Sequence, residues 1–189
     1  NETTNKNKKK KKRNNANGTK RLPTITVNRN ANGQQLKPAV GIAANGSFAV
    51  TWEDDSDGNG KFQVIGARFN AQGAKTGNDF TVNSNSDGQQ KNPDIAMNGL
   101  GNFVVVWEDD SNENGLYQVI GARFNASGIK QGNDFKVNTT AAGQQKSPAI
   151  SISPIGDFVI VWADDSDSNN SYQILGRGFF ANGSEKFTA

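Results

Sequence analysis

The sequence predicts an all-β protein made of three tandem blade-like repeats, each a four-stranded antiparallel sheet. A fixed period of 55 residues separates Trp52, Trp107 and Trp162, and no insertion breaks the register. Only 33% of the residues are apolar, which favours short strands joined by many turns over a helical core. Other residues keep the same period: Gln34, Gln89 and Gln144; Pro38, Pro93 and Pro148; Phe69, Phe124 and Phe179.

The second repeat shows the four strands most clearly. Apolar and β-branched runs predict strands at Pro93–Met97, Phe103–Glu108, Leu116–Asn125 and Asp134–Asn138. Gly and Asn residues between the first two strands are typical of a tight hairpin. The third strand carries apolar groups on both faces, so we expect it to be packed on both sides.

The repeat divides the chain into four parts. We expect a basic arm at 1–21, a first blade at 22–83, a second at 84–138 and a third at 139–189. The segment Thr24–Asn28 matches the fourth strand of a repeat but precedes the first complete copy, and Glu185–Ala189 matches a truncated fourth strand. A surplus strand with a free edge invites pairing with another chain.

The arm differs from the rest of the chain in charge. It contains nine Lys or Arg residues against Glu2 and carries a net charge of +8, while the remainder carries −5. Without periodic apolar positions, the arm is predicted to be either disordered or bound to a partner. It contains no aromatic residue for base stacking, so nucleic acid is not the expected partner. The densest cluster is Lys8, Lys9, Lys10, Lys11, Lys12 and Arg13.

An acidic turn follows the second strand of each repeat. Alternate oxygen-bearing side chains before a Gly resemble the start of a calcium-binding loop, although the acidic residue at position twelve is replaced by Gly. Calcium binding and a plain turn, in which Asp and Asn bond their own backbone, are the two interpretations. The candidate ligands are Asp55, Asp57, Asn59, Asp110, Asn112, Asn114, Asp165, Asp167 and Asn169.

Other residues argue against catalysis. The chain contains no Cys and no His, which removes thiolate nucleophiles and the commonest general base. Adjacent carboxylates such as Asp109 and Asp110 point to opposite faces of a strand, so they cannot easily flank one bond. We therefore predict that the protein is not an enzyme.

The repeated Trp and Gln residues allow a second interpretation. Trp52, Trp107 and Trp162 are expected in the core, but exposed indoles would stack sugar rings and give a lectin with three equivalent sites. Gln34, Gln89 and Gln144 would either bridge blades or bind a ligand.

The complete pattern resembles a known class of repeats. The elements P-x-[VI]-[AS], F-[AV]-V-x-W, [YF]-Q-[VI]-x-G, N-A-x-G, F-x-V-N and G-Q-Q-x-x-P are similar to the tandem repeats of large bacterial secreted and cell-surface proteins, often found beside calcium-binding and adhesive modules. The resemblance covers residues 24–189 and implies four-stranded β-propeller blades, exposure at the cell surface and no catalytic site. Family arrays usually carry more copies than three.

Three blades do not close a propeller, which needs about four to eight. We expect one of three arrangements: a ring shared by several chains, an open head-to-tail filament, or a self-closed trefoil or prism. If the sequence is a fragment of a longer array of repeats, none of these arrangements is needed. We expect homo-oligomers or polymers joined through Thr24, Ile25, Thr26, Val27, Asn28 and the basic arm. The functional expectation is self-assembly and adhesion outside the cell, with calcium as the only candidate cofactor. The alternatives are glycan binding by a lectin and polyanion binding by the arm, and no transmembrane segment is expected.

Overall fold

The computed structural model describes residues 24–187, which form three antiparallel four-stranded sheets. Blade 1 contains β1 (Gln35–Ile42), β2 (Phe48–Asp54), β3 (Gln63–Phe69) and β4 (Phe80–Thr81). Blade 2 contains β5 (Gln89–Met97), β6 (Phe103–Asp110), β7 (Gln118–Phe124) and β8 (Phe135–Lys136). Blade 3 contains β9 (Gln144–Ile152), β10 (Phe158–Asp165), β11 (Gln173–Phe179) and β12 (Glu185–Phe187).

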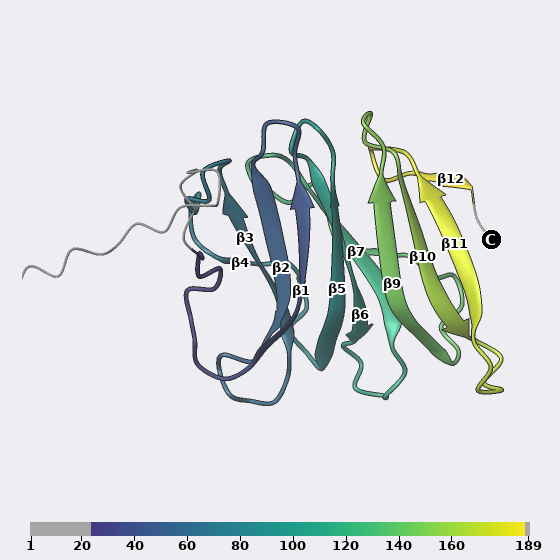
Figure 1. The fold of residues 1–189 in the computed structure, drawn as a ribbon. Coiled ribbons are helices and arrows are strands. Elements are labelled where there is room, and N and C mark those ends of the chain that lie inside the picture. The colour runs from purple at the N-terminus through teal and green to yellow at the C-terminus, as the bar shows by residue number, and fades with distance from the viewer. Residues whose placement is uncertain (1–23, 188–189) are drawn as a thin grey trace, which may run out of the picture.

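The strands of each sheet lie side by side in chain order. The first strands β1, β5 and β9 are neighbours at the centre, and the fourth strands lie at the outer edges, as Figure 1 shows. The predicted fold class of three blade-like antiparallel sheets is confirmed. The three sheets stack face to face with β1, β5 and β9 adjacent, as propeller blades do, so the chain does not adopt the alternative trefoil or prism.

The strand bounds differ from those predicted: in the second repeat β6 runs two residues further, to Asp110, and β7 and β8 are shorter than expected. The first strands begin at Gln35, Gln89 and Gln144, before the prolines, because each strand crosses a bulge instead of starting after it. The surplus segment Thr24–Asn28 has no strand assignment, since no strand of the described residues lies beside it to complete a ladder. The prediction that this segment is a strand is therefore wrong for the isolated chain.

A left-handed residue precedes the repeated proline in every first strand. Lys37, Asn92 and Ser147 have φ angles of 50°, 47° and 52°, and the pairing register shifts at each of them. This region is unfavourable for residues with a Cβ, so it persists only where the surroundings hold it.

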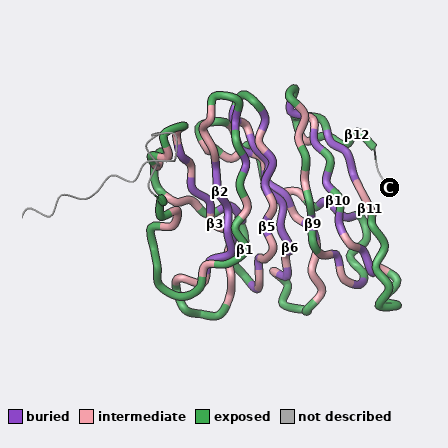
Figure 2. Tube along the Cα trace, in the orientation of Figure 1, coloured by how far each residue is buried: buried purple, intermediate pink, exposed green. Residues whose placement is uncertain are grey.

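The hydrophobic core lies between neighbouring blades. Val64 and Val82 of blade 1 pack in one cluster with Phe103, Trp107 and Phe124 of blade 2. The rings of Phe103 and Phe124 are stacked with centroids 4.9 Å apart, and Phe80 tilts against both. The same arrangement recurs one blade later in a cluster that includes Val119, Val137, Phe158, Trp162 and Phe179. Figure 2 shows the buried residues concentrated on these facing strands.

A buried glutamate of the preceding blade holds the left-handed bulge in blade 2 and in blade 3. Glu53 of blade 1 accepts the Asn92 backbone N–H at 2.6 Å, and Glu108 of blade 2 accepts the Ser147 N–H at 2.7 Å. Both glutamates are buried. A carboxylate is a strong acceptor for an N–H that would otherwise be buried without a partner, so these bonds orient one blade on the next.

We predict that Glu108→Ala destabilises the fold by about 1–3 kcal/mol, because it leaves the Ser147 N–H without its acceptor. Urea unfolding followed by Trp fluorescence measures the change. Glu113→Ala is the matched control in the same blade, since Glu113 is exposed and forms a surface ion pair with Lys61. Its unfolding midpoint should move little. Equal midpoints for the two variants would contradict the role given to Glu108.

Candidate functional site

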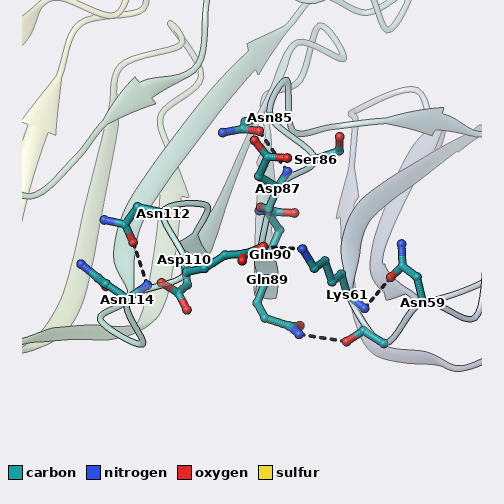
Figure 3. A network of polar contacts seen from close by, with 12 residues as sticks. Asn59, Lys61, Asn85, Ser86, Asp87, Gln89, Gln90, Asp110, Asn112 and Asn114 are labelled. Carbon is teal, nitrogen blue, oxygen red and sulfur yellow. Dashed lines mark hydrogen bonds and ion pairs between the residues drawn. The ribbon is translucent and has the colours of Figure 1, made fainter.

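The three acidic turns are held by their own side chains. In each turn, the first aspartate of the candidate calcium ligands accepts the backbone N–H of the residue five positions later, at 2.9–3.2 Å. The acceptors Asp55, Asp110 and Asp165 bind the N–H groups of Gly60, Gly115 and Asn170. Later side chains accept N–H groups two residues on; the acceptors are Asp57, Asn59, Asn112, Asn114, Asp167 and Asn169. Figure 3 shows Asp110, Asn112 and Asn114 gathered in the turn of blade 2. These bonds order the turn without an ion.

Within residues 24–187, no group of three or more Asp, Glu, His or Cys side chains is placed to hold a metal ion. A calcium ion would therefore have to take many of its ligands from amide and backbone oxygens. It would also compete with the backbone N–H groups for the first carboxylate of each motif. Calcium binding stays a prediction for these turns.

The tryptophans lie in the core, and their indole N–H groups bind a nearby aspartate. Trp52, Trp107 and Trp162 are all buried, and each indole N–H donates to the carboxylate two residues on. In blade 2 that acceptor is Asp109, which also accepts the Ser111 N–H at 3.0 Å. The first member of each carboxylate pair therefore binds the indole, and the second binds the turn. The indoles are at most 4% exposed, which leaves little ring face for stacking a sugar.

The repeated glutamines join the blades. The Gln89 amide donates to the Gly60 carbonyl at 2.9 Å and accepts the Phe62 N–H, and Gln144 makes the same pair of bonds with Gly115 and Tyr117. Figure 3 shows the Gln89 side chain reaching across to blade 1. Gln34 occupies the equivalent position in blade 1, and it is exposed because no described blade precedes it. The structure thus places Gln89 and Gln144 in blade junctions.

Two further kinds of junction contact were not predicted from the sequence. Arg68 donates to the Ala126 carbonyl of the next blade and Arg123 to that of Ala181, both at 3.0 Å. Burial lowers the pKa of Arg123. The second contact is the bond between Glu53 and the bulge. Its sequence signal is a Glu at 53 and 108 in phase with the prolines, replaced by Ala163 in the third repeat.

The N-terminal segment packs on blade 1. Inside the chain, the fourth strands of blades 1 and 2 pack on the next blade in the same way. Val27 packs against the cluster of Val50, Trp52, Ala67 and Phe69. The backbone N–H of Arg29 donates to Asp79 at 2.7 Å, matching the bond from Ser84 to Asp134 one repeat later. The predicted assembly residues Thr24–Asn28 therefore lie on the outer side of the first blade. The basic residues Lys8–Lys12 and Arg13 lie outside the described residues.

The outer face of blade 3 exposes apolar side chains that blade 2 buries. Val159, Val161 and Ile174 are 40%, 38% and 74% exposed. Their equivalents one repeat earlier are Val104, Val106 and Val119, which are 3%, 0% and 0% exposed. On the opposite end of the molecule, a groove of about 190 Å³ lined by Val27, Leu36, Pro38, Val50 and Trp52 lies open on blade 1. Blade 3 therefore ends in an uncovered face, whereas the apolar side chains of blade 1 are covered in part by Val27 of the N-terminal segment.

These features define a protein of blade-like β-repeats with a candidate interaction site at each end. Comparison with protein-family models gives no match, and no curated protein is similar in sequence. Among solved structures, a protein of unknown function from Dyadobacter fermentans has a TM-score of 0.58 at 15% identity over 84% of this chain.

Two other similar structures are enzymes from Bacteroides. An endo-arabinase from Bacteroides thetaiotaomicron has a TM-score of 0.48 at 13% identity over 78% of this chain, and a glycosyl hydrolase from Bacteroides ovatus has 0.48 at 14% over 80%. The chain spans about half the length of these three proteins, at 55%, 56% and 51%. At such low identity the likeness concerns the fold alone.

The short outer strand β12 is held by ion pairs. Lys186 contacts Asp157 at 2.9 Å and Glu185 contacts Arg177 at 2.7 Å. The hydrogen bond from Lys186 lowers the pKa of Asp157, and the Ala181 N–H adds to the effect. A carboxyl group with a lowered pKa stabilises the fold fully above its ordinary value of about 4, and the contribution disappears as the pH falls through the lowered pKa.

We predict that β12 loosens in acid below about pH 4. Amide proton exchange in Glu185–Phe187, followed by NMR between pH 3 and 6, should accelerate beyond its intrinsic pH dependence as Asp157 is protonated. Asp157→Asn should remove this extra acceleration. If exchange in β12 follows the intrinsic dependence throughout in the unmodified chain, the ion pair does not hold the strand.

Proposed function

We propose that this chain is a non-catalytic β-repeat protein that assembles head to tail through its two terminal blade faces. The observation that carries the proposal is the exposure of Val159, Val161 and Ile174 on blade 3. An exposed patch that matches a buried interface of the same chain indicates an interaction surface. Head-to-tail contact between different faces gives rings when the rotation closes and filaments when it does not.

The two terminal faces are the two halves of a contact that the chain forms twice internally. The outer side of blade 1 carries Phe48, Val50, Trp52 and Phe69, which pack here against Val27 and correspond to the residues of blades 2 and 3 that pack on the preceding blade. Blade 3 presents the side that packs on a following blade. The third blade of one copy therefore matches the first blade of another in shape and chemistry.

We further propose that this assembly is adhesive and acts outside the cell, at a bacterial surface. The support is the resemblance of residues 24–189 to repeats of secreted and surface proteins. The absence of Cys from the sequence is compatible with any redox environment. Among the described residues, no helix has the length and hydropathy to cross a membrane.

We predict that the 189-residue chain forms concentration-dependent oligomers. Light scattering with negative-stain microscopy, over roughly micromolar to millimolar protein, should show rings of a few chains or filaments, because burial of two apolar faces favours association. If calcium orders the acidic turns, a chelator should weaken the assembly and lower the melting temperature. A monomer at every concentration would contradict the proposed function, whatever the chelator does.

A further inference from the structure

We propose that residues Thr24–Asn28 of one copy pair with the outer edge of β11 in a second copy and complete its third blade. This inference rests on the proposed head-to-tail assembly and names the strand, the edge and the register by which it occurs. Donor and acceptor lie at opposite ends of the three blades, as Figure 1 shows, so they meet only between copies of the described structure.

The donor segment already holds the position of a fourth strand relative to the blade that follows it. The Asn28 amide donates to the Asn30 carbonyl at 2.7 Å and to the Gln35 side chain at 3.3 Å. Its equivalent in blade 2, Asn138, donates to Thr140 and Gln145 at 2.6 and 3.2 Å. The segment therefore keeps the bonds that a fourth strand makes forward along the chain.

The internal copies also make bonds backward, to the third strand of their own blade. The Val82 N–H donates to the Val64 carbonyl at 2.8 Å, and the Val64 N–H donates to the Asn83 side chain at 2.9 Å. The Asn83 amide then reaches Gln63 at 2.7 Å. Val119, Val137, Asn138 and Gln118 repeat the set in blade 2. Thr24–Asn28 makes no such bonds within the described residues.

The acceptor edge is open at the matching position. In blades 1 and 2 the fourth strand pairs at Ile65–Gly66 and Ile120–Gly121, whereas β12 pairs with β11 only at Gly178 and Phe179. Within residues 24–187, nothing therefore pairs with the outer edge of β11 at Ile174–Gly176. Ile174 is the equivalent of Val64 and Val119, and its backbone groups face this edge.

The side chains fit as well as the backbone. Phe80 and Phe135 lie over Gly66 and Gly121, where an added Cβ would stand 2.6 Å from the ring. Over Gly176 the nearest side chain is Val161 at 3.2 Å, because Phe187 has moved to Gly178. Ile25 of the incoming segment is the residue that corresponds to Phe80. The register thus pairs Val27 with Ile174, Ile25 with Gly176, and the Asn28 amide with Gln173.

One internal bond is missing from the proposed joint. Lys37 is the left-handed residue of blade 1 that should receive a carboxylate from the preceding blade, as Asn92 and Ser147 do. In the third blade Ala163 stands where Glu53 and Glu108 stand in the others. The joint between copies therefore uses the same pairing with one charge-assisted bond fewer.

Disulfide trapping tests the register, since the chain has no cysteine of its own. Val27→Cys and Ile174→Cys are prepared as separate full-length chains, mixed at equal concentration and oxidised mildly. We expect a covalent dimer in the mixture and little in either chain alone, because antiparallel partners lie within disulfide range. Val27→Cys mixed with Leu100→Cys is the matched control, since Leu100 is equally exposed but lies in a hairpin turn of blade 2.

The outcomes separate the two proposals. If the chains assemble by light scattering but the Val27 and Ile174 mixture links no better than the control, the strand pairing is overturned and assembly stands. If the chains neither assemble nor link, both are overturned. Circular dichroism and the melting temperature of each single variant confirm that it is folded, which is expected for Ile174 because its side chain is exposed.

A gain-of-function variant supplies an independent measurement. Ala163→Glu should restore the missing acceptor for the Lys37 N–H and tighten association about tenfold, as one hydrogen bond to a charged group would. Ala163→Gln is the control for size, and it should tighten association less because it is neutral. Sedimentation measures both. An unchanged or weaker association for Ala163→Glu would place the third blade in a different register or against a different surface.

Discussion

Each blade of this protein is apolar on both faces, and the whole structure depends on that constraint. Blade 2 buries Val104 and Val106 against blade 3, and Phe103 and Val105 against blade 1. A sheet with two apolar faces is stable in water only when both are covered. A blade at the end of one chain therefore needs a cover that the packed blades of that chain do not supply.

The two ends of the described chain meet this requirement differently. Blade 1 is partly covered by its own N-terminal segment, with Val27 in the apolar cluster and Arg29 bonded to Asp79. Blade 3 has no equivalent cover among the described residues, and Ile174 lies exposed beside an open strand edge. An open strand edge beside exposed apolar side chains favours pairing with another strand. Blade 3 is therefore the end of the described chain that is more prone to association.

The period of Trp, Pro and Phe was sufficient to predict the three sheets and the order of their strands. Such periodicity fixes which residues share a face, and the blade arrangement follows from it. Contacts that join distant residues could not be predicted in the same way. The bond from Glu53 to the Asn92 N–H depends on a left-handed backbone, which the sequence around Pro93 does not reveal because any residue before proline is expected to be extended. Likewise, the sequence of the acidic turns is compatible with calcium ligands and with side-chain turns, and only the structure shows the bonds that the Gly60 and Gly115 N–H groups donate to Asp55 and Asp110.

The differences between the third repeat and the others bear on how strongly the ends would join. Inside the chain, a junction combines apolar packing, paired glutamine bonds and a buried carboxylate on the bulge. In the proposed joint between copies, the packing and the strand register would be preserved, but Ala163 stands where the buried carboxylate would be needed. Because the lost bond is worth about a factor of ten or more in affinity, the joint between copies would be weaker than the joints within one. Folding of each chain would then precede assembly, and the assembled state would respond to concentration while the blades themselves stay intact.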